Sequence, residues 1–395
     1  MLHGADGKAL HITQGLTDEQ VLNSPDLKQI RASMLQGEWP TACERCRQVE
    51  ATGGTSSRNH FNTRYAHWTD DSIAQTLPDG TLTRPAVRYA DIRLGNVCNL
   101  TCRMCGPDAS RLWADHYNQT QPKRHQFSIQ HLAAARDQNW VKSQPLEWLV
   151  QQCLPTIEGV NFGGGEPLII PEMVQVLELL VASGRAGEIN LAYNTNITVL
   201  PEKVTRLWSK FRSVSLLCSI DGFGPLNEYI RRPSKWRDID RNLHLLDEHA
   251  EEWKLRPVLV SATVQIYNVL QIGDLLDYLS SGFKNIAPVP QLVPLYGPPY
   301  MNIQMLPPQV KEVARERLSA ARARAELQDW PNVRWLASTF DSTMAYMDQG
   351  QMGRQELMEF LFFSENSDRV FGDSWRRACP DLARLLFPQT AARVG

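Results

Sequence analysis

Short apolar segments alternate with helical segments from residue 86 to about residue 293. These segments are apolar at successive positions, a pattern typical of parallel strands covered by helices. Parallel strands also need a crossover between them, usually a helix. Six strand–helix units in succession therefore predict an α/β fold, an open or partial (β/α)6 barrel with ligands bound at the carboxyl ends of its strands. The expected strands are residues 86–95, 159–164, 188–196, 213–221, 256–268 and 285–293.

The pattern divides the chain into three expected regions. Residues 1–85 form an N-terminal module that carries a Cys-x2-Cys pair, and residues 86–300 form the partial barrel. Residues 301–395 follow a proline-rich stretch and form a C-terminal helical region. Within the barrel, residues 171–184 give the clearest helix, because Pro171 suits its first turn and Gly184 marks its end.

Composition excludes several classes of protein. The 41 basic and 43 acidic residues nearly cancel, which argues against a nucleic-acid partner. The N-terminus lacks the pattern of a secretory signal, and no run of eighteen apolar residues predicts a membrane span. We therefore expect a cytoplasmic protein. Eight cysteines, five of them in two tight clusters, then favour metal ligands over disulfides.

The stretch CNLTCRMCG directly follows the first expected strand and contains Cys98, Cys102 and Cys105. A structural zinc site needs four ligands, usually from two separated pairs, and this loop supplies three with no histidine beside it. Iron–sulfur clusters are also held by cysteine thiolates. A four-iron cube with only three cysteine ligands keeps one iron open, and an open metal position is where a substrate or cofactor binds.

This Cys-x3-Cys-x2-Cys loop resembles the cluster-binding loop of the radical S-adenosylmethionine (SAM) superfamily. The resemblance implies a [4Fe–4S] cluster on Cys98, Cys102 and Cys105, with SAM chelated by the open iron. It also implies that Met104 lies near the adenine, where the family often has an aromatic residue. In that family, an electron from the reduced cluster cleaves SAM to a 5′-deoxyadenosyl radical, which abstracts hydrogen from the substrate.

Further motifs at the ends of successive strands also resemble this family. The run GGEP implies a site for the SAM amino group, and it also fits a tight strand-to-helix turn. Asn196 and Ser219 match residues that contact the ribose, although Ile197 replaces a glycine. Asp221 either joins them or caps the next turn, and Arg231 either meets the SAM carboxylate or is a solvated helix-end arginine. The implied cofactor-binding residues are Met104, Gly164, Gly165, Glu166, Pro167, Asn196, Ser219, Asp221 and Arg231, with Trp113, Gln265 and Asn268 as further candidates for the pocket.

Cys43 and Cys46 form a separate Cys-x2-Cys pair, which alone is compatible with zinc, a redox pair or a cluster. Their segment resembles the auxiliary-cluster modules called twitch and SPASM, which implies a possible second iron–sulfur cluster with Cys43 and Cys46 among its ligands. Cys218 and Cys153 lie in apolar segments and are expected in the core, while the role of Cys379 stays open.

Three functional interpretations follow. The first is a radical SAM enzyme that modifies a peptide or protein side chain and takes its electron from a donor such as flavodoxin or ferredoxin. The second is a radical SAM enzyme that acts on a small molecule, such as a sugar or an antibiotic precursor. The third is an iron–sulfur protein that does not cleave SAM. Formation of 5′-deoxyadenosine under reducing conditions separates the first two from the third.

Overall fold

The computed structural model describes residues 17–51, 56–138, 146, 149–350 and 353–388. The chain divides into two compact units. The N-terminal unit comprises Met1–Ala90 and Lys142–Ile157, and the sheet unit comprises Asp91–Val141 and Glu158–Gly395.

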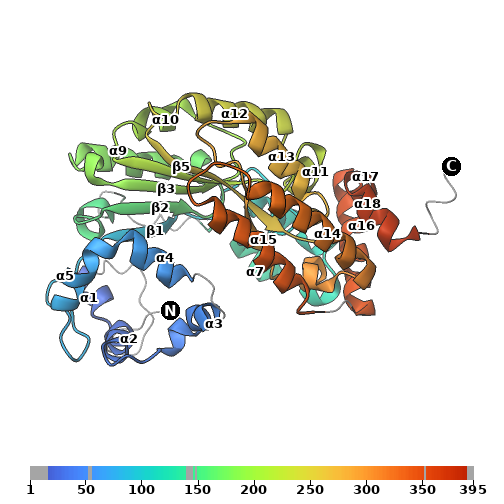
Figure 1. The fold of residues 1–395 in the computed structure, drawn as a ribbon. Helices are drawn as coiled ribbons and strands as arrows, with labels where there is room; N and C mark the ends of the chain where they lie inside the picture. Colours follow the sequence, from blue (N-terminus) through green and yellow to red (C-terminus); the bar gives the residue numbers. More distant parts are fainter. Residues whose placement is uncertain (1–16, 52–55, 139–145, 147–148, 351–352, 389–395) are drawn as a thin grey trace. The chain divides into compact units, whose positions relative to one another are not determined.

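Six strands form one sheet in the order β1-β2-β3-β4-β5-β6 (Figure 1). From β2 to β6 each neighbouring pair is parallel, with Gly159 opposite Asn190 and Asn190 opposite Ser213 at the first positions. The sheet confirms the α/β fold and its strand order. The strands are β1 (Tyr89–Arg93), β2 (Gly159–Gly163), β3 (Asn190–Thr195), β4 (Ser213–Ser219), β5 (Leu255–Val264) and β6 (Gln291–Pro294).

The expected strand at residues 285–293 is the one most displaced. β6 begins at Gln291, and the segment before it makes a single bridge, between Ile286 and Val258 of β5. Pro288 and Pro290 explain the difference, because proline has no N–H to donate to a ladder. The edge of β6 is covered by helix α15 (Val333–Met347), whose Thr339 hydroxyl accepts a hydrogen bond from Leu292 N at 3.2 Å.

Helices connect the strands and continue to the C-terminus. α9, α10, α12 and α13 lie along one face of the sheet (Figure 1). α9 buries Met173, Val176, Leu177 and Leu180, the apolar face that the sequence pattern predicts. The helices of this unit are α6 (Tyr117–Thr120), α7 (Ile129–Ala135), α9 (Pro171–Ala182), α10 (Glu202–Trp208), α11 (Pro225–Ile230), α12 (Trp236–Glu248), α13 (Ile272–Gly282), α14 (Pro308–Ala325), α15 (Val333–Met347), α16 (Arg354–Phe371), α17 (Trp375–Ala378) and α18 (Pro380–Leu386).

The N-terminal unit is built from short helices that polar side chains hold together. Asn23 exchanges two hydrogen bonds with the backbone of Leu82, and Arg31 donates to the carbonyl oxygens of Leu22 and Gly80. Its helices are α1 (Asp18–Leu22), α2 (Pro25–Leu35), α3 (Glu44–Ala51), α4 (Ser57–Arg64) and α5 (Thr69–Ala74).

A buried carboxyl group ties the end of β2 to the end of β3. Thr195 Oγ1 donates to Glu166 Oε1 at 2.7 Å, and Asn196 N donates to Glu166 Oε2 at 2.6 Å. Leu168 N adds a third hydrogen bond at 3.1 Å. Burial raises the pKa of Glu166 to about 7, although these hydrogen bonds act to lower it.

The turn before Glu166 also packs against the chain that leaves β1. Gly165 has a φ of 54°, and a Cβ there would lie 2.2 Å from Val97 O. Gly164 has a φ of 76°, and its Cβ would lie 2.9 Å from Gly95 O. Glu166 N donates to Val97 O at 2.8 Å, so the two segments approach backbone to backbone. Only glycine allows that approach with this φ.

Glu166→Gln should change how stability depends on pH. The raised pKa keeps Glu166 protonated in the folded state while the unfolded state ionises from an ordinary pKa of about 4.3. The wild-type free energy of unfolding should therefore fall by about 3 kcal/mol from pH 4 to pH 7 through this group. Urea unfolding of the protein without cofactors should show that the variant lacks this fall. A variant-to-wild-type difference that is constant over this range would contradict the assignment.

Gly165→Ala should destabilise the sheet unit, because the new Cβ meets backbone and the left-handed φ disfavours alanine. We expect a melting temperature lower by roughly 5 °C or more. Gly187→Ala is the matched control, since nothing lies within 4 Å of a Cβ at Gly187. Equal melting temperatures for the two variants would show that the turn relaxes without cost.

Candidate functional site

The cysteine loop follows β1 and is held by backbone hydrogen bonds to the end of α11 and the segment that follows it. Thr101 N donates to Arg232 O at 2.7 Å, and Arg103 N donates to Ile230 O at 2.9 Å. Trp113 lies fully buried, and its indole N–H donates to Cys102 O at 3.1 Å. The backbone of the loop is thus fixed on both sides of Cys102.

The three thiols of the loop interact with one another. Cys102 is buried, and Cys98 and Cys105 are half-buried. Burial raises the pKa of Cys98 to about 12. The hydrogen bond between Cys102 and Cys105 raises the pKa of Cys102 and lowers that of Cys105. The positive charge of Arg231 lowers the pKa of all three thiols, so it favours the thiolate form that binds metal.

Arg231 forms a buried ion pair with Asp221. Arg231 Nε lies 2.7 Å from Asp221 Oδ2, and Arg231 Nη2 donates to Asp221 Oδ1 at 3.1 Å. Thr263 N also donates to Asp221 Oδ1, at 2.7 Å. Burial raises the pKa of Asp221, and the charge of Arg231 opposes that rise. Asp221 therefore orients the guanidinium beside the cysteine loop, and Arg231 is buried rather than a solvated helix-end arginine.

Asn196 lies beside the first cysteine. Its Nδ2 donates to Asn99 Oδ1 at 3.0 Å and lies 4.0 Å from Cys98 Sγ. Its Oδ1 accepts hydrogen bonds from the N and Oγ1 of Thr198. The Asn196 side-chain amide thus connects the end of β3 to the cysteine loop, and its nitrogen and oxygen both have partners within the protein.

Ile197 stands where the motif it resembles has a glycine, and it adopts a backbone conformation that glycine reaches more easily. Its φ is 52°, and its side chain is fully buried. Asn242 Nδ2 donates to Ile197 O at 2.9 Å, which helps to hold this conformation. A β-branched residue with this φ is strained, so the surrounding packing must stabilise the turn.

The remaining candidates lie at the same edge of the sheet or close to it. Ser219 is the last residue of β4 and pairs with Ser261 of β5. Met104 is half-buried in the cysteine loop, and Pro167 is buried at the start of a 3₁₀ turn. Gln265 follows β5, is fully buried, and its Oε1 has no hydrogen-bond partner among the described residues.

Asn268 is part of the scaffold. Its Nδ2 donates to Asp221 O at 2.7 Å and to Thr263 O at 3.0 Å, and its Oδ1 accepts from Gln265 N. Asn99, Thr198 and Arg103 contribute to the site without having been singled out from the sequence. Asn99 and Arg103 each adjoin a cysteine of the loop, and only this proximity could have pointed to them.

Cys43 and Cys46 lie in the N-terminal unit, on a 3₁₀ turn and on α3, and both are half-buried. The Arg58 guanidinium interacts electrostatically with both thiols, and it also forms an ion pair with Glu50. Across the described ranges, no three His, Cys, Asp or Glu side chains are arranged to hold a single metal ion. Cys218 and Cys379 are buried core residues, and the side chain of Cys153 lies outside the described ones.

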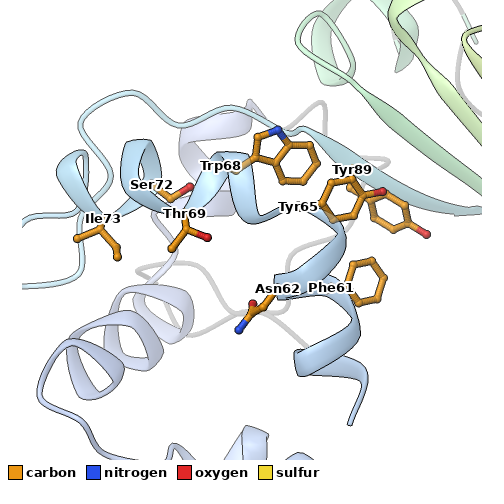
Figure 2. Close-up of a pocket in the computed structure, with 8 residues that line it drawn as sticks. All are labelled: Phe61, Asn62, Tyr65, Trp68, Thr69, Ser72, Ile73 and Tyr89. Atoms are coloured by element: carbon orange, nitrogen blue, oxygen red, sulfur yellow. The ribbon is translucent and has the colours of Figure 1, made fainter. Parts of the chain in front are cut away.

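The N-terminal unit also has a cavity of about 330 Å³ with aromatic walls (Figure 2). Tyr65 stacks on Trp68 with ring centroids 3.9 Å apart, and Phe61 meets Tyr89 edge-on at 5.2 Å. Its lining includes none of the residues singled out from the sequence.

None of the described helices has both the length and the apolar character needed to span a membrane.

The part of the chain that carries the cysteine loop and the ends of strands β2 to β4 is similar to one protein family. Residues 92–260 match the model of the radical SAM superfamily. This match covers the chain from β1 to β5 and includes every candidate residue except the N-terminal pair and those after residue 260. A radical SAM domain implies an enzyme that uses a [4Fe–4S] cluster and SAM.

Individual curated proteins share limited sequence identity with this chain. GTP 3′,8-cyclase 1 from two strains of Mycobacterium tuberculosis is 29% identical over 147 residues, or 33% of this chain. The matched part of the chain spans only 34% of the length of these curated relatives.

Two solved structures are also similar. Native anSMEcpe with bound AdoMet has a TM-score of 0.42 and 16% identity, covering 60% of each chain. Streptococcus suis SuiB bound to precursor peptide SuiA has a TM-score of 0.33 and 15% identity, covering 69% of this chain and 54% of that one. The match shows a radical SAM domain over residues 92–260 of this chain.

Proposed function

We propose that this protein reductively cleaves SAM at a [4Fe–4S] cluster held by Cys98, Cys102 and Cys105 and uses the product to abstract hydrogen from a substrate. One observation carries the proposal. Three mutually interacting thiols and a buried, oriented guanidinium meet at the carboxyl edge of a parallel sheet. Bound there, the cluster and SAM supply the radical chemistry, and the chain supplies the ligands, the orientation and the exclusion of water.

The residues present fit such a cofactor. Three thiols with no histidine are the donor set of an iron–sulfur cluster, and Arg231 offsets part of the negative charge of the thiolates. Because burial raises the pKa of Cys98, ligation must release its proton. Gln265 Oε1, buried without a partner among the described residues, is a further polar group that a ligand could satisfy.

The structure also suggests how the other residues act. Arg231, held by Asp221, would meet the SAM carboxylate, so Asp221 is a positioning residue in this proposal. Asn196 positions Cys98, and Glu166 holds the turn that carries Gly164 and Gly165. The backbone of that turn, rather than the Glu166 carboxylate, would then meet the amino group, because the carboxylate already accepts three hydrogen bonds. In this proposal, Met104 lies near the adenine of SAM and Ser219 contacts its ribose.

For the substrate, we propose a peptide or protein side chain, because the Cys43–Cys46 segment resembles modules common in peptide-modifying relatives. A small molecule is the second candidate, and the similarity to GTP 3′,8-cyclase 1 favours it. Flavodoxin or ferredoxin is the proposed electron donor.

Iron and acid-labile sulfide after anaerobic reconstitution test the cluster. We expect about four irons per chain, all lost when Cys98, Cys102 and Cys105 are replaced by alanine. Each single replacement should also abolish formation of 5′-deoxyadenosine from SAM under dithionite. Cys218→Ala is the control, because Cys218 is buried in β4 outside the loop.

Near-native SAM cleavage in any single loop variant would refute the assignment of the loop. About eight irons in the wild type, with about four surviving in the triple variant, would instead place a second cluster at Cys43 and Cys46. A cluster without any 5′-deoxyadenosine would favour the iron–sulfur protein that does not cleave SAM.

Arg231→Lys should weaken SAM binding by about tenfold or more while the iron content stays near that of the wild type. Lysine keeps the charge beside the thiols but loses the two-point contact with Asp221 that orients the group. Equilibrium binding of SAM to the reconstituted, oxidised protein measures the effect. Unchanged binding would remove Arg231 from the proposed SAM site.

Deuterium transfer separates the two substrate classes. A deuterated cell extract is divided by size into a peptide and protein fraction and a small-molecule fraction, and each is incubated with the reduced protein and SAM. We expect deuterium in 5′-deoxyadenosine with the peptide and protein fraction. Deuterium only with the other fraction would identify a small-molecule substrate.

A further inference from the structure

The first of the two residues between the second and third cysteines of the loop is bound by acidic residues at the end of α16. Arg103 lies between Cys102 and Met104, and its side chain is only 1% exposed. Its Nη2 lies 3.1 Å from Asp368 Oδ1 and 3.0 Å from Asp373 Oδ2. These two acids stand at the end of α16, more than 260 residues further along the chain.

A second arginine completes a four-residue network. Arg232 Nε lies 2.9 Å from Asp373 Oδ2, and Arg232 Nη2 donates to Phe371 O at 3.2 Å. Arg232 also provides the carbonyl that accepts the Thr101 N–H of the cysteine loop. We call Arg103, Arg232, Asp368 and Asp373 the clasp. Two positive and two negative charges balance within it.

The end of α16 is shaped to present both acids. Gly372 has a φ of 73° and ends the helix in the left-handed conformation, and Asp373 N then donates to Asp368 O at 3.0 Å. Trp375 N donates to Asp368 Oδ2 at 2.7 Å, and Tyr229 OH donates to Asp368 Oδ1 at 3.1 Å. The Asp368 carboxylate is thus oriented by groups other than Arg103.

Aromatic contacts also connect the cysteine loop, α11 and the end of α16. The Arg103 guanidinium lies 3.8 Å from the centre of the Tyr229 ring, and the Arg232 guanidinium lies 4.2 Å from that of Phe371. Phe371 also meets Trp113 edge-on at 5.7 Å, and Trp113 donates to Cys102 O. The end of α16 therefore reaches the loop through Arg103 and through Trp113.

We propose that the clasp is a positioning device by which the C-terminal helices hold the cysteine loop in the geometry that binds its ligand. A buried guanidinium needs its counter-charges, so the loop can leave this position only when Arg103 loses both acids. The loop then keeps its shape without cofactor, and the spacing of Cys102 and Cys105 depends on α16. The inference rests on the proposed function only for the identity of the ligand.

Thiol alkylation of the cofactor-free protein tests the clasp. In Asp368→Asn/Asp373→Asn, peptide mass spectrometry should show Cys102 and Cys105 reacting at least tenfold faster than in the wild type. Cys43 and Cys46 of the N-terminal unit serve as the internal reference. The matched control is Glu365→Gln/Asp381→Asn, which neutralises two acids of α16 and α18 that pair with other arginines. Rates within twofold of the wild type in a folded clasp variant would overturn the proposal.

A spectroscopic measurement separates positioning from plain stability. After reconstitution, the milder Asp373→Asn variant should show altered EPR g-values of the reduced cluster, and the control should match the wild type. Faster alkylation with an unchanged spectrum would reduce the clasp to a stability element and overturn its positioning role. If the wild type binds no iron, the proposed function fails, and the alkylation result still decides whether the clasp holds the loop.

A measurement on the wild type alone covers the case in which the double variant does not fold. Hydrogen exchange at rising urea should expose the amides of residues 98–105 and of α16 at the same urea concentration. Protection of the loop that outlasts α16 would show that the loop does not depend on the clasp.

Discussion

Parallel hydrogen bonding between the strands is the constraint on which the site depends. Strands β2 to β6 run in one direction, so all their carboxyl ends meet at one edge of the sheet. Polar residues that follow β2, β3 and β4 are therefore brought beside a cysteine loop that follows β1. Glu166 shows the consequence, because its carboxyl group joins the ends of β2 and β3 directly.

Charge is buried at this edge in pairs. Asp221 and Arg231 form one pair, and the clasp forms a second, larger group around Arg103. Breaking a buried ion pair by removing one partner is strongly destabilising, whereas an intact pair fixes orientation. Both groups adjoin the cysteine loop, one through its Coulomb interaction with the thiols and one through the side chain of Arg103. The loop is thus held by charge as well as by backbone hydrogen bonds.

Three residues with positive φ lie in the same region. Gly164, Gly165 and Ile197 all have positive φ, and all three lie in turns that follow β2 or β3. At Ile197 a buried aliphatic side chain occupies a conformation that glycine would adopt more easily. Such strain persists only where the surroundings over-determine it, and here Asn242 and the packing around Ile197 do so.

The sequence by itself determined the α/β class, the strand order and the cysteine loop, because these follow from local periodicity, turn residues and cysteine spacing. It also indicated the candidate residues at the strand ends, but it misplaced β6, where prolines interrupt an apolar run. Only the tertiary structure decided what those residues touch. Glu166, Asn196 and Asp221 all bind other parts of the chain, and Arg103 finds its partners more than 260 residues away. The reason is physical: a buried polar group must find a partner, and the fold rather than the local sequence decides which partner is within reach.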